Sequence, residues 1–312
     1  MSRLPVFHYG KARLTAGFAL KLARGLAQGQ IDEDTDSKIR QSRDAVKSIV
    51  NSGEVVYGVN TGFGPLCRET ISAEDTKILQ EHILRSHSSG IGAPIGEEKS
   101  KLMLILKLHA LSKGYSGVSP ELIERIGLQI EKNLVPVVPS QGSVGASGDL
   151  APLAHLFLPL IGLGKLHSGG EIVEAGKVLG DMGIPPLTLG PKEGLALING
   201  TQFMAAHGVS ALERFHNCLD CADIIGAMTL ESLLGSVKPF KPELHELRPY
   251  GGTRHTAYRL RHLLQDSEMV ESHKACKKVQ DPYSLRCMPQ VHGASRQAWL
   301  HLKETVEIEI NS

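Results

Sequence analysis

Aromatic residues are scarce in this sequence, and neither sign of charge dominates. Phe, Trp and Tyr make up 4% of the 312 residues, and 34 Lys and Arg stand against 33 Asp and Glu, for a net charge of +1. Proteins that bind nucleic acid or anionic membranes usually carry a basic surface, often with aromatic residues among the charges. Neither partner is expected here, so the expected ligand is a small molecule.

Long hydrophobic runs are also missing. The longest apolar stretch, residues 153–163, contains His155 and Pro159 and is shorter than the roughly 18 residues that a membrane span requires. Residues 1–10 lack the apolar run of a secretory signal. The five cysteines are an odd number without the spacing of a disulfide scaffold, which is typical of a reducing compartment. We therefore expect a cytoplasmic protein without membrane association.

Signals for helix ends are frequent in the sequence. Residues that cap helices precede several amphipathic stretches, and glycine or proline follows them. The apolar residues in these stretches recur with the period of a helix. The signals are Asp36 before a stretch that ends at Gly53, Ser72 with Asp75 as a capping box, and Ser119-Pro120 before a helix reaching about residue 134.

The remaining pattern predicts a mainly α fold. Apolar residues occupy nearly every face between residues 101 and 111, which indicates a helix buried on most sides. Residues 191–234 predict one or two long helices of a bundle, and the chain is helical again from Gly293. Small β elements are expected at a hairpin over residues 167–173 and at residues 55–57. The best domain boundary, near residue 190, separates an N-terminal domain (1–190) from the first part of a helical bundle (191–312).

Three segments concentrate glycine and small polar residues. Tight turns explain such clusters in most proteins, and that interpretation stays open for each of them taken alone. None matches GxxxxGK[ST], and none places GxGxxG between a clear strand and a helix, so phosphate binding is not expected. The segments are residues 57–64 (YGVNTGFG), 88–96 (SSGIGAPIG) and 142–148 (GSVGASG).

The third segment permits an unusual reaction of the backbone. If the nitrogen of Gly148 attacks the carbonyl carbon of Ala146 and two waters are lost, one of them with the Ser147 hydroxyl, a five-membered ring with an exocyclic methylene results. Glycine offers the least steric resistance to this attack, and a helix N-terminus expected after Asp149 would stabilise negative charge on the ring. Such a ring is a strong electrophile.

Residues 142–155 (GSVGASGDLAPLAH) resemble the signature of the aromatic amino acid ammonia-lyases. Three further motifs follow the same order in that family, and together they cover nearly the whole chain. The resemblance implies that Ala146-Ser147-Gly148 becomes 4-methylidene-imidazole-5-one (MIO), with no diffusible cofactor. It also implies the mainly α architecture of the fumarase/aspartase-like superfamily, with an MIO-bearing N-terminal domain and a central helical bundle. The further motifs are residues 57–64, 195–202 (LALINGTQ) and 279–290 (VQDPYSLRCMPQ).

The resemblance also assigns roles to single residues. Tyr57 matches the tyrosine that does acid/base work, although a free phenol titrates near 10 and needs help to act near neutral pH. Arg286 matches the partner of the substrate carboxylate, a role suited to two parallel guanidinium donors. Without the flanking motifs, a buried aromatic would be the favoured interpretation of Tyr57, and a surface ion pair would explain Arg286 equally well. The remaining matches are Tyr283, the second tyrosine of the site, and Asn199 and Gln280, the amides that hold ring and substrate.

The substrate is expected from the pair Ser86-His87. This pair is similar to that of the histidine-specific members, and His87 is able to hydrogen-bond an imidazole, whereas an apolar residue there would suit a phenyl ring. As a lone histidine it would otherwise be a satisfied core or surface group. The implied reaction converts L-histidine to trans-urocanate and ammonia.

A metal site is not expected. Cys218 and Cys221 form a CxxC pair, but a second ligand pair with zinc spacing is missing. Because residues three apart share a helix face, these two are interpreted as core thiols.

The chain is shorter than the resembling enzymes, which are homotetramers with sites built from several chains. We therefore expect a C-terminally truncated form that lacks further helices of the bundle, and a homotetramer where those helices are supplied. Two alternatives stay open. One is an inactive fragment with a structural or associating role, and the other is an MIO ammonia-lyase or aminomutase acting on another aromatic amino acid.

Overall fold

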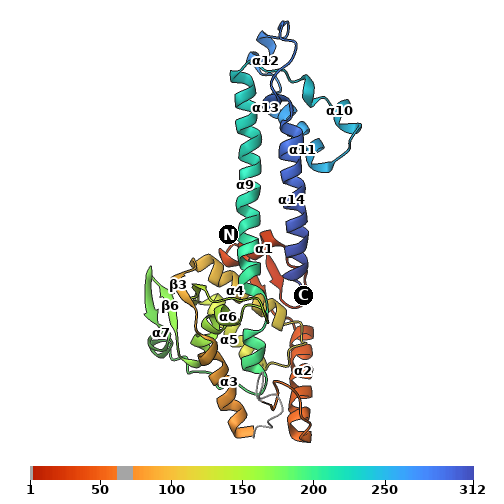
Figure 1. Ribbon diagram of the computed structural model, residues 1–312. Helices are drawn as coiled ribbons and strands as arrows, with labels where there is room; N and C mark the ends of the chain where they lie inside the picture. The colour runs from red at the N-terminus through yellow and green to blue at the C-terminus, as the bar shows by residue number, and fades with distance from the viewer. Residues whose placement is uncertain (1–2, 62–72) are drawn as a thin grey trace. The chain divides into compact units, whose positions relative to one another are not determined.

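The computed structural model describes residues 3–61 and 73–312, and of residues 73–76 the backbone only. The described part is mainly helical with small β elements, as predicted (Figure 1). By compactness the chain divides into one unit of residues 1–210 with 306–312 and a second unit of residues 211–305. Each unit is described by itself. Among the described residues, no helix combines the length and the apolar character needed to cross a membrane.

The helices of the first unit begin and end with the expected capping chemistry. Gly53 ends α2 in the left-handed conformation, as predicted, but this helix begins at Glu33 because Asp32, not Asp36, accepts the N–H of Thr35 at 2.9 Å. The predicted caps Ser72 and the side chain of Asp75 lie outside the described residues. The helices are α1 (Ala16–Ala23), α2 (Glu33–Ser52), α3 (Ala73–His87), α4 (Glu97–Leu111), α5 (Pro120–Glu131), α6 (Leu150–Phe157), η2 (Leu158–Ile161), α7 (Ala175–Asp181) and α8 (Glu193–Ile198).

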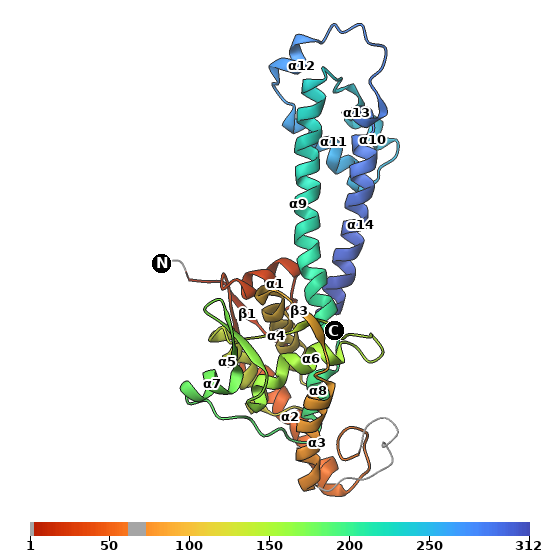
Figure 2. The same cartoon turned by 60° about the vertical axis from the view of Figure 1, so that its left-hand side comes forward.

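Helix α4 forms the centre of this unit. It packs against α1, α5 and α6, and its residues from Leu102 to Leu106 are almost completely buried, as the apolar pattern predicts. Helix α5 begins as predicted, with Pro120 in its first turn and the Ser119 hydroxyl accepting the N–H of Leu122 at 3.3 Å. It ends at Glu131, three residues before the expected end. Figure 2 shows α3, α6 and α8 grouped below this centre, and each of the three packs against the other two.

Three small sheets complete the first unit. The predicted hairpin is confirmed as β6 and β7, joined by Gly169 and Gly170, which both have positive φ. Residues 55–57, expected to be extended, form no strand and lead into a turn. The pairs are β1 (Val6–His8) parallel to β2 (Gln28–Gln30), β3 (Ile91–Pro94) antiparallel to β5 (Pro139–Gln141), and β6 (Lys165–Ser168) antiparallel to both β4 (Val135–Pro136) and β7 (Glu171–Glu174).

The predicted domain boundary near residue 190 lies inside the first compact unit. The carbonyl of Pro191 accepts a hydrogen bond of 2.9 Å from Arg43 of α2, and α8 packs against α3 and α6. These contacts attach the segment after residue 190 to the elements before it. The compact division therefore falls at residues 210 and 211, within α9 (Gln202–Ser232).

The second unit is an antiparallel pair of long helices with short elements at one end. The Trp299 indole donates to the carbonyl of Leu212 at 2.8 Å, while His292 reaches Asp223, so α9 and α14 (Met288–Glu309) run in opposite directions here (Figure 1). A core that includes Leu230, Phe240, Leu260 and Leu285 joins the short elements to the pair. These elements are η3 (Lys238–Phe240), α10 (Pro242–Glu246), α11 (Gly251–Leu263), α12 (Glu268–Ser272) and α13 (Tyr283–Arg286).

Candidate active site

The segment that carries Ala146, Ser147 and Gly148 is paired with the turn between α8 and α9. Gly148 forms a parallel bridge with Gly200, and the N–H of Asp149 donates to the carbonyl of Gly200 at 2.7 Å. A Cβ at Gly148 would lie 2.2 Å from that carbonyl oxygen, and Gly148 has φ of +89°. Only glycine fits at this position.

The buried carboxylate of Asp149 accepts hydrogen bonds from both the small-residue segment and the start of α9. It is completely buried at the start of α6, and one oxygen accepts the Ser143 hydroxyl at 2.7 Å. The other oxygen accepts the N–H groups of Phe203 and Met204, each at 3.0 Å, in the first turn of α9. A carboxylate is favoured there by the helix dipole and the unpaired amides. Asp149 therefore joins the small-residue segment to α9, a role that the sequence did not reveal.

This arrangement fits the proposed ring. Ala146 and Ser147 lie exposed on the segment, and both are small, so side chains do not obstruct the approach of one backbone atom to another. Gly148 is held where a side chain would clash, and its neighbour Asp149 is fixed by five hydrogen bonds through its backbone and side chain. The segment is thus anchored at its C-terminal end and accessible at the two residues before it.

Asn199 lies at the end of α8. The apolar run around it had predicted a position inside a helix, and this prediction was wrong. Its backbone is extended, with ψ of 133°, and Gly200 follows with φ of +138°. The Asn199 side chain donates to the carbonyl of Leu195 at 3.0 Å. The pairing of Gly200 with Gly148 explains the break, and it places Asn199 beside the Ala146–Gly148 segment.

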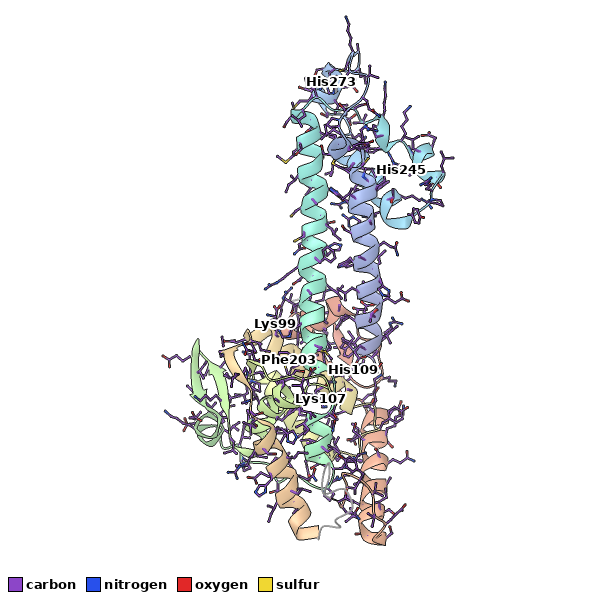
Figure 3. All side chains as sticks on the ribbon, viewed as in Figure 1. Lys99, Lys107, His109, Phe203, His245 and His273 are labelled. Carbon is purple, nitrogen blue, oxygen red and sulfur yellow. The ribbon has the colours of Figure 1, made fainter. Side chains whose placement is uncertain are left out.

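A buried lysine contacts the same turn. The ammonium of Lys107, on α4, donates to the carbonyl of Asn199, and burial lowers the pKa of Lys107 to about 7 (Figure 3). Sequence reasoning missed this residue, although a lone charge in the run LMLILKLHAL was a usable signal. Lys107 and Asn199 also line a hollow of about 420 Å³ in the first unit.

His87 is the last residue of α3. Its Nδ1 lies 2.9 Å from the carbonyl of Ile83 and 3.1 Å from the Ser86 hydroxyl. A carbonyl accepts only, so Nδ1 carries the proton and Nε2 of the neutral ring is left as an acceptor. This tautomer suits an N–H donor such as an imidazole.

The segment after His87 is attached to the small-residue segment. Nε2 of His155, on α6, accepts the N–H of Gly90 at 3.0 Å, and burial lowers the pKa of His155. Strand β3 then pairs Ile91 with Gln141, one residue before Gly142. The structure therefore brings the end of α3 into the same region as Ala146–Gly148.

Tyr57 lies in the turn that follows α2 and is 55% exposed. Asn60 shapes this turn, because its side chain accepts the N–H of Val56 at 2.9 Å and donates to the carbonyl of Glu54 at 2.7 Å. Gly58 has φ of +73°. The exposed side chain shows that Tyr57 is not the buried aromatic of the alternative interpretation.

The other three predicted residues lie together in the second unit. The guanidinium of Arg286 is 4.8 Å from the ring centre of Tyr283, and its Nε donates to the carbonyl of Asp281 at 2.6 Å. With its amide oxygen turned toward Arg286, Gln280 accepts from both terminal nitrogens, at 2.8 and 3.2 Å. Tyr283 and Gln280 are exposed. The cation–π contact and the neutral acceptors orient Arg286 without neutralising its charge.

Among the described residues, no group of three or more His, Cys, Asp or Glu side chains is arranged to hold a metal ion. Cys218 and Cys221 are both exposed, so their interpretation as core thiols was wrong. The pair does share a face of α9, but the core of the second unit is formed by other positions, such as Ala227 and Leu230.

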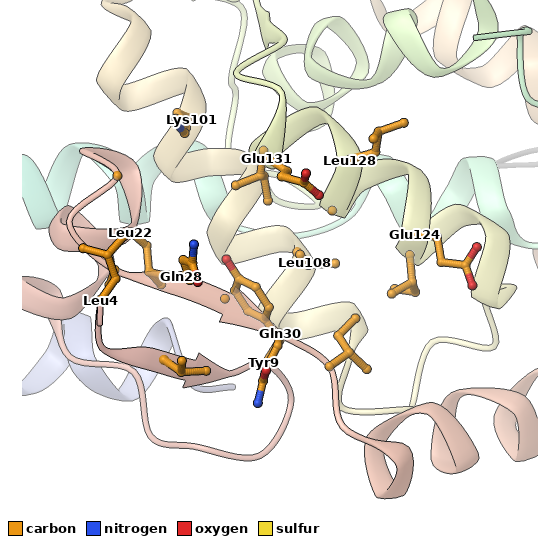
Figure 4. A pocket seen from close by; sticks show the side chains of 18 residues that line it. Leu4, Tyr9, Leu22, Gln28, Gln30, Lys101, Leu108, Glu124, Leu128 and Glu131 are labelled. Atoms are coloured by element: carbon orange, nitrogen blue, oxygen red, sulfur yellow. The ribbon is translucent and has the colours of Figure 1, made fainter. Parts of the chain in front are cut away.

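A second hollow, of about 710 Å³, lies in the first unit between β1, β2, α4 and α5 (Figure 4). The ring of Tyr9 points into it, and burial raises the pKa of Tyr9. None of the predicted site residues lines this hollow. It is therefore separate from the candidate active site.

Comparison with known proteins agrees with the motifs. Residues 14–312 match the family model described as aromatic amino acid lyase. Over 293 residues the chain is 46% identical to a histidine ammonia-lyase of Myxococcus xanthus, covering 94% of this chain and 58% of that protein. It is 42% identical over 299 residues to the one of Streptococcus sanguinis, covering 96% and 58%. The chain thus spans about 58% of the length of these curated relatives.

Solved structures show the same fold. A histidine ammonia-lyase from Trypanosoma cruzi superposes with a TM-score of 0.87 at 34% identity, covering 98% of this chain and 57% of that one. A tyrosine aminomutase from Streptomyces globisporus gives a TM-score of 0.91 at 33% identity, covering 99% and 61%. With the sequence match over nearly its whole length, the chain belongs to the aromatic amino acid lyase family.

Proposed function

We propose that this chain carries the electrophile-forming part of a histidine ammonia-lyase, which converts L-histidine to trans-urocanate and ammonia. The observation that carries the proposal is the placement of Ala146-Ser147-Gly148, anchored at Gly148 and Asp149 beside Asn199. Relatives of 42–46% identity with the name histidine ammonia-lyase support the choice of reaction.

The chain would make its own MIO group from these three residues. The Gly148 nitrogen attacks the Ala146 carbonyl carbon, one water leaves as the ring closes, and a second leaves with the Ser147 hydroxyl. When formed, the group supplies an electrophile that draws electrons from the substrate and lets ammonia depart. Asp149 and Gly200 would hold the segment during closure, and the amide of Asn199 would hold the ring.

The other residues would bind the substrate and move its protons. Arg286 offers two parallel donors to the substrate carboxylate, and Gln280 and Tyr283 keep its guanidinium in place. Tyr57 would take the proton from the β-carbon, and Tyr283 would serve as the second tyrosine of the site. In this assignment the chain needs no diffusible cofactor and no metal.

Substrate choice is assigned to His87. Its Nε2, left as an acceptor by the bond of Nδ1 to Ile83, would receive the N–H of the substrate imidazole. A phenyl ring has no donor to give in its place. The acceptor would therefore favour histidine over phenylalanine.

We further propose that a cytoplasmic homotetramer forms where the further helices of the longer relatives are supplied, and that it binds neither nucleic acid nor membrane. Large apolar side chains are exposed on the long helices of the second unit, among them Ile225 at 60% and Met228 at 61% on α9 and Val291 at 63% on α14. Such side chains on a helix face are typical of subunit interfaces. With those helices supplied, light scattering would give four chains per particle, and a monodisperse monomer would then contradict the tetramer.

An absorbance assay for urocanate with added L-histidine tests the reaction. The wild-type chain, assayed at the size measured in solution, should form urocanate, and Ser147→Ala should form none. A folded tetramer without product would contradict activity of this chain and would leave an associating role. Tyrosine or phenylalanine converted to a β-amino acid would point instead to an aminomutase, the activity named for the Streptomyces globisporus structure.

A further inference from the structure

Lys107 is a lysine with its charged end inside the first unit. Only 3% of its surface is exposed, and the neighbouring positions on α4, from Met103 to Leu108, are almost completely buried apolar residues. Its nitrogen donates to the carbonyl of Asn199. A buried ammonium needs such an acceptor to replace the water it has lost.

Overall stability does not account for this lysine. Burial lowers its pKa to about 7, which means that the folded state disfavours the charged form. An apolar side chain of the same length would avoid this desolvation. The hydrogen bond from Lys107 to Asn199 is therefore better explained by the backbone that it orients than by a gain in stability.

The contact fixes one of two successive carbonyls. Lys107 holds the carbonyl of Asn199, and the N–H of Asp149 holds the carbonyl of Gly200 at 2.7 Å. Gly200 is in turn paired with Gly148, the residue whose nitrogen closes the ring in the proposed function. Rotation about the Cα–C bond of Asn199 would move the Asn199 carbonyl away from Lys107 and would carry Gly200 with it, which would loosen this pairing.

We propose that Lys107 is a positioning residue for ring closure, which orients the Asn199–Gly200 turn so that Gly148 is held against it. The inference rests on the proposed function and adds to it a residue outside the motifs that carry the family resemblance. Lys107 acts through the turn, because its hydrogen bond goes to Asn199 and not to one of the three ring-forming residues.

The test compares Lys107→Met with the wild-type chain. Methionine has similar length and no donor. Amide hydrogen exchange at Asp149 should become about tenfold faster, the ratio that corresponds to one net hydrogen bond, while thermal stability stays equal or rises. The fraction of purified chain that has lost two waters, read from intact mass, should fall several-fold. Exchange in the β6–β7 hairpin should not change.

Two further variants separate this role from a general effect. Lys101→Met changes a lysine on the same helix whose nitrogen bonds Asn133 at 2.7 Å, and it should leave Asp149 exchange and ring formation as in the wild type. Lys107→Arg keeps a donor, has the 420 Å³ hollow beside it to accommodate the guanidinium, and should restore slow exchange.

Unchanged Asp149 exchange and unchanged ring formation in Lys107→Met would overturn the inference. Equal loosening in Lys101→Met would overturn it as well, because the effect would then belong to α4 as a whole. A wild-type chain of unmodified mass would instead contradict the proposed function, and the exchange comparison alone would then decide whether Lys107 holds the turn.

Discussion

The Gly148 Cα and the Gly200 carbonyl oxygen approach so closely that a Cβ on Gly148 would lie 2.2 Å from that oxygen. This contact joins a segment at the start of α6 to the turn before α9, more than fifty positions along the chain. It explains why position 148 is a glycine, whereas a Cβ on Gly200, which also has positive φ, would lie 2.3 Å from the Gln202 side chain. It also fixes the end of the tripeptide at which ring closure would begin.

A side chain at Gly148 should therefore be poorly tolerated. Gly148→Ala combines a backbone clash with a strained φ, and we expect a loss of about 3 kcal/mol in the free energy of unfolding. Gly145→Ala is the matched control, because Gly145 has φ of +68° but nothing within 4 Å of its Cβ, so the loss should be about 1 kcal/mol. Equal losses in urea denaturation would contradict the contact.

Asp149 should be a large contributor to the stability of the first unit. Asp149→Asn removes the charge and places an amide N–H₂ against donors, so we expect a loss of about 2 kcal/mol. Asp181→Asn, an exposed aspartate on α7, serves as control and should be neutral. Chemical denaturation measures both. An Asp149→Asn chain as stable as the control would show that the carboxylate is not needed to cap α9.

His87 should determine the substrate. His87→Leu removes the acceptor for the imidazole, and kcat/KM for L-histidine should fall about a hundredfold or more in the urocanate assay. His82→Leu, which changes an exposed histidine on the same helix, should keep the wild-type value. If both variants retain full activity with histidine, the specificity lies elsewhere.

His109 should make the first unit sensitive to acid. Burial lowers its pKa to about 4, and its Nδ1 accepts the N–H of Gly10 at 3.1 Å, which requires the neutral ring. The unfolded chain binds the proton below the ordinary value of 6.5, so stability is complete above that pH and falls between 6.5 and about 4. The slope reaches at most about 1.4 kcal/mol per pH unit.

His109→Asn gives the comparison for this pH dependence. Asparagine keeps an acceptor and does not titrate, so the free energy of unfolding should change less between pH 6.5 and 4 than in the wild type. Identical pH profiles for the two chains would mean that another group causes the acid response.

Local chemistry was predictable where neighbours in sequence decide it. The cap at Ser119 and the left-handed Gly53 depend on a few adjacent residues, and both are confirmed. Helix α2 begins one turn earlier than predicted because Asp32 and Asp36 are both good caps by sequence. The structure uses Asp32, and Asp36 lies in the first turn, where acidic residues are also favoured.

Features that depend on distant partners were not predictable. The apolar run around Asn199 indicated a position inside a helix, but α8 ends there, where Gly200 pairs with Gly148. Burial of Asp149 and Lys107 likewise follows from contacts across long sequence separations. Which face of α9 is covered also depends on α11 and α14, and for this reason the prediction for Cys218 and Cys221 failed.

The roles of the site residues remain predictions. The structure places His87, Ala146–Gly148 and Asn199 in one region of the first unit and Gln280, Tyr283 and Arg286 in one cluster of the second. These residues could be identified from the sequence because each of them lies in a short motif that matches the family. The contacts that hold them in place, such as those of Asp149 and Lys107, became visible only in the structure.

The intact mass of the folded chain tests the central claim most directly. If Ala146, Ser147 and Gly148 close the ring, the purified protein will weigh less than its sequence by two waters, and peptide mapping will place the loss within residues 146–148. Ser147→Ala lacks the hydroxyl that leaves as the second water and will not show the loss of two waters. A wild-type mass equal to that of the unmodified sequence, in folded protein, would contradict the account.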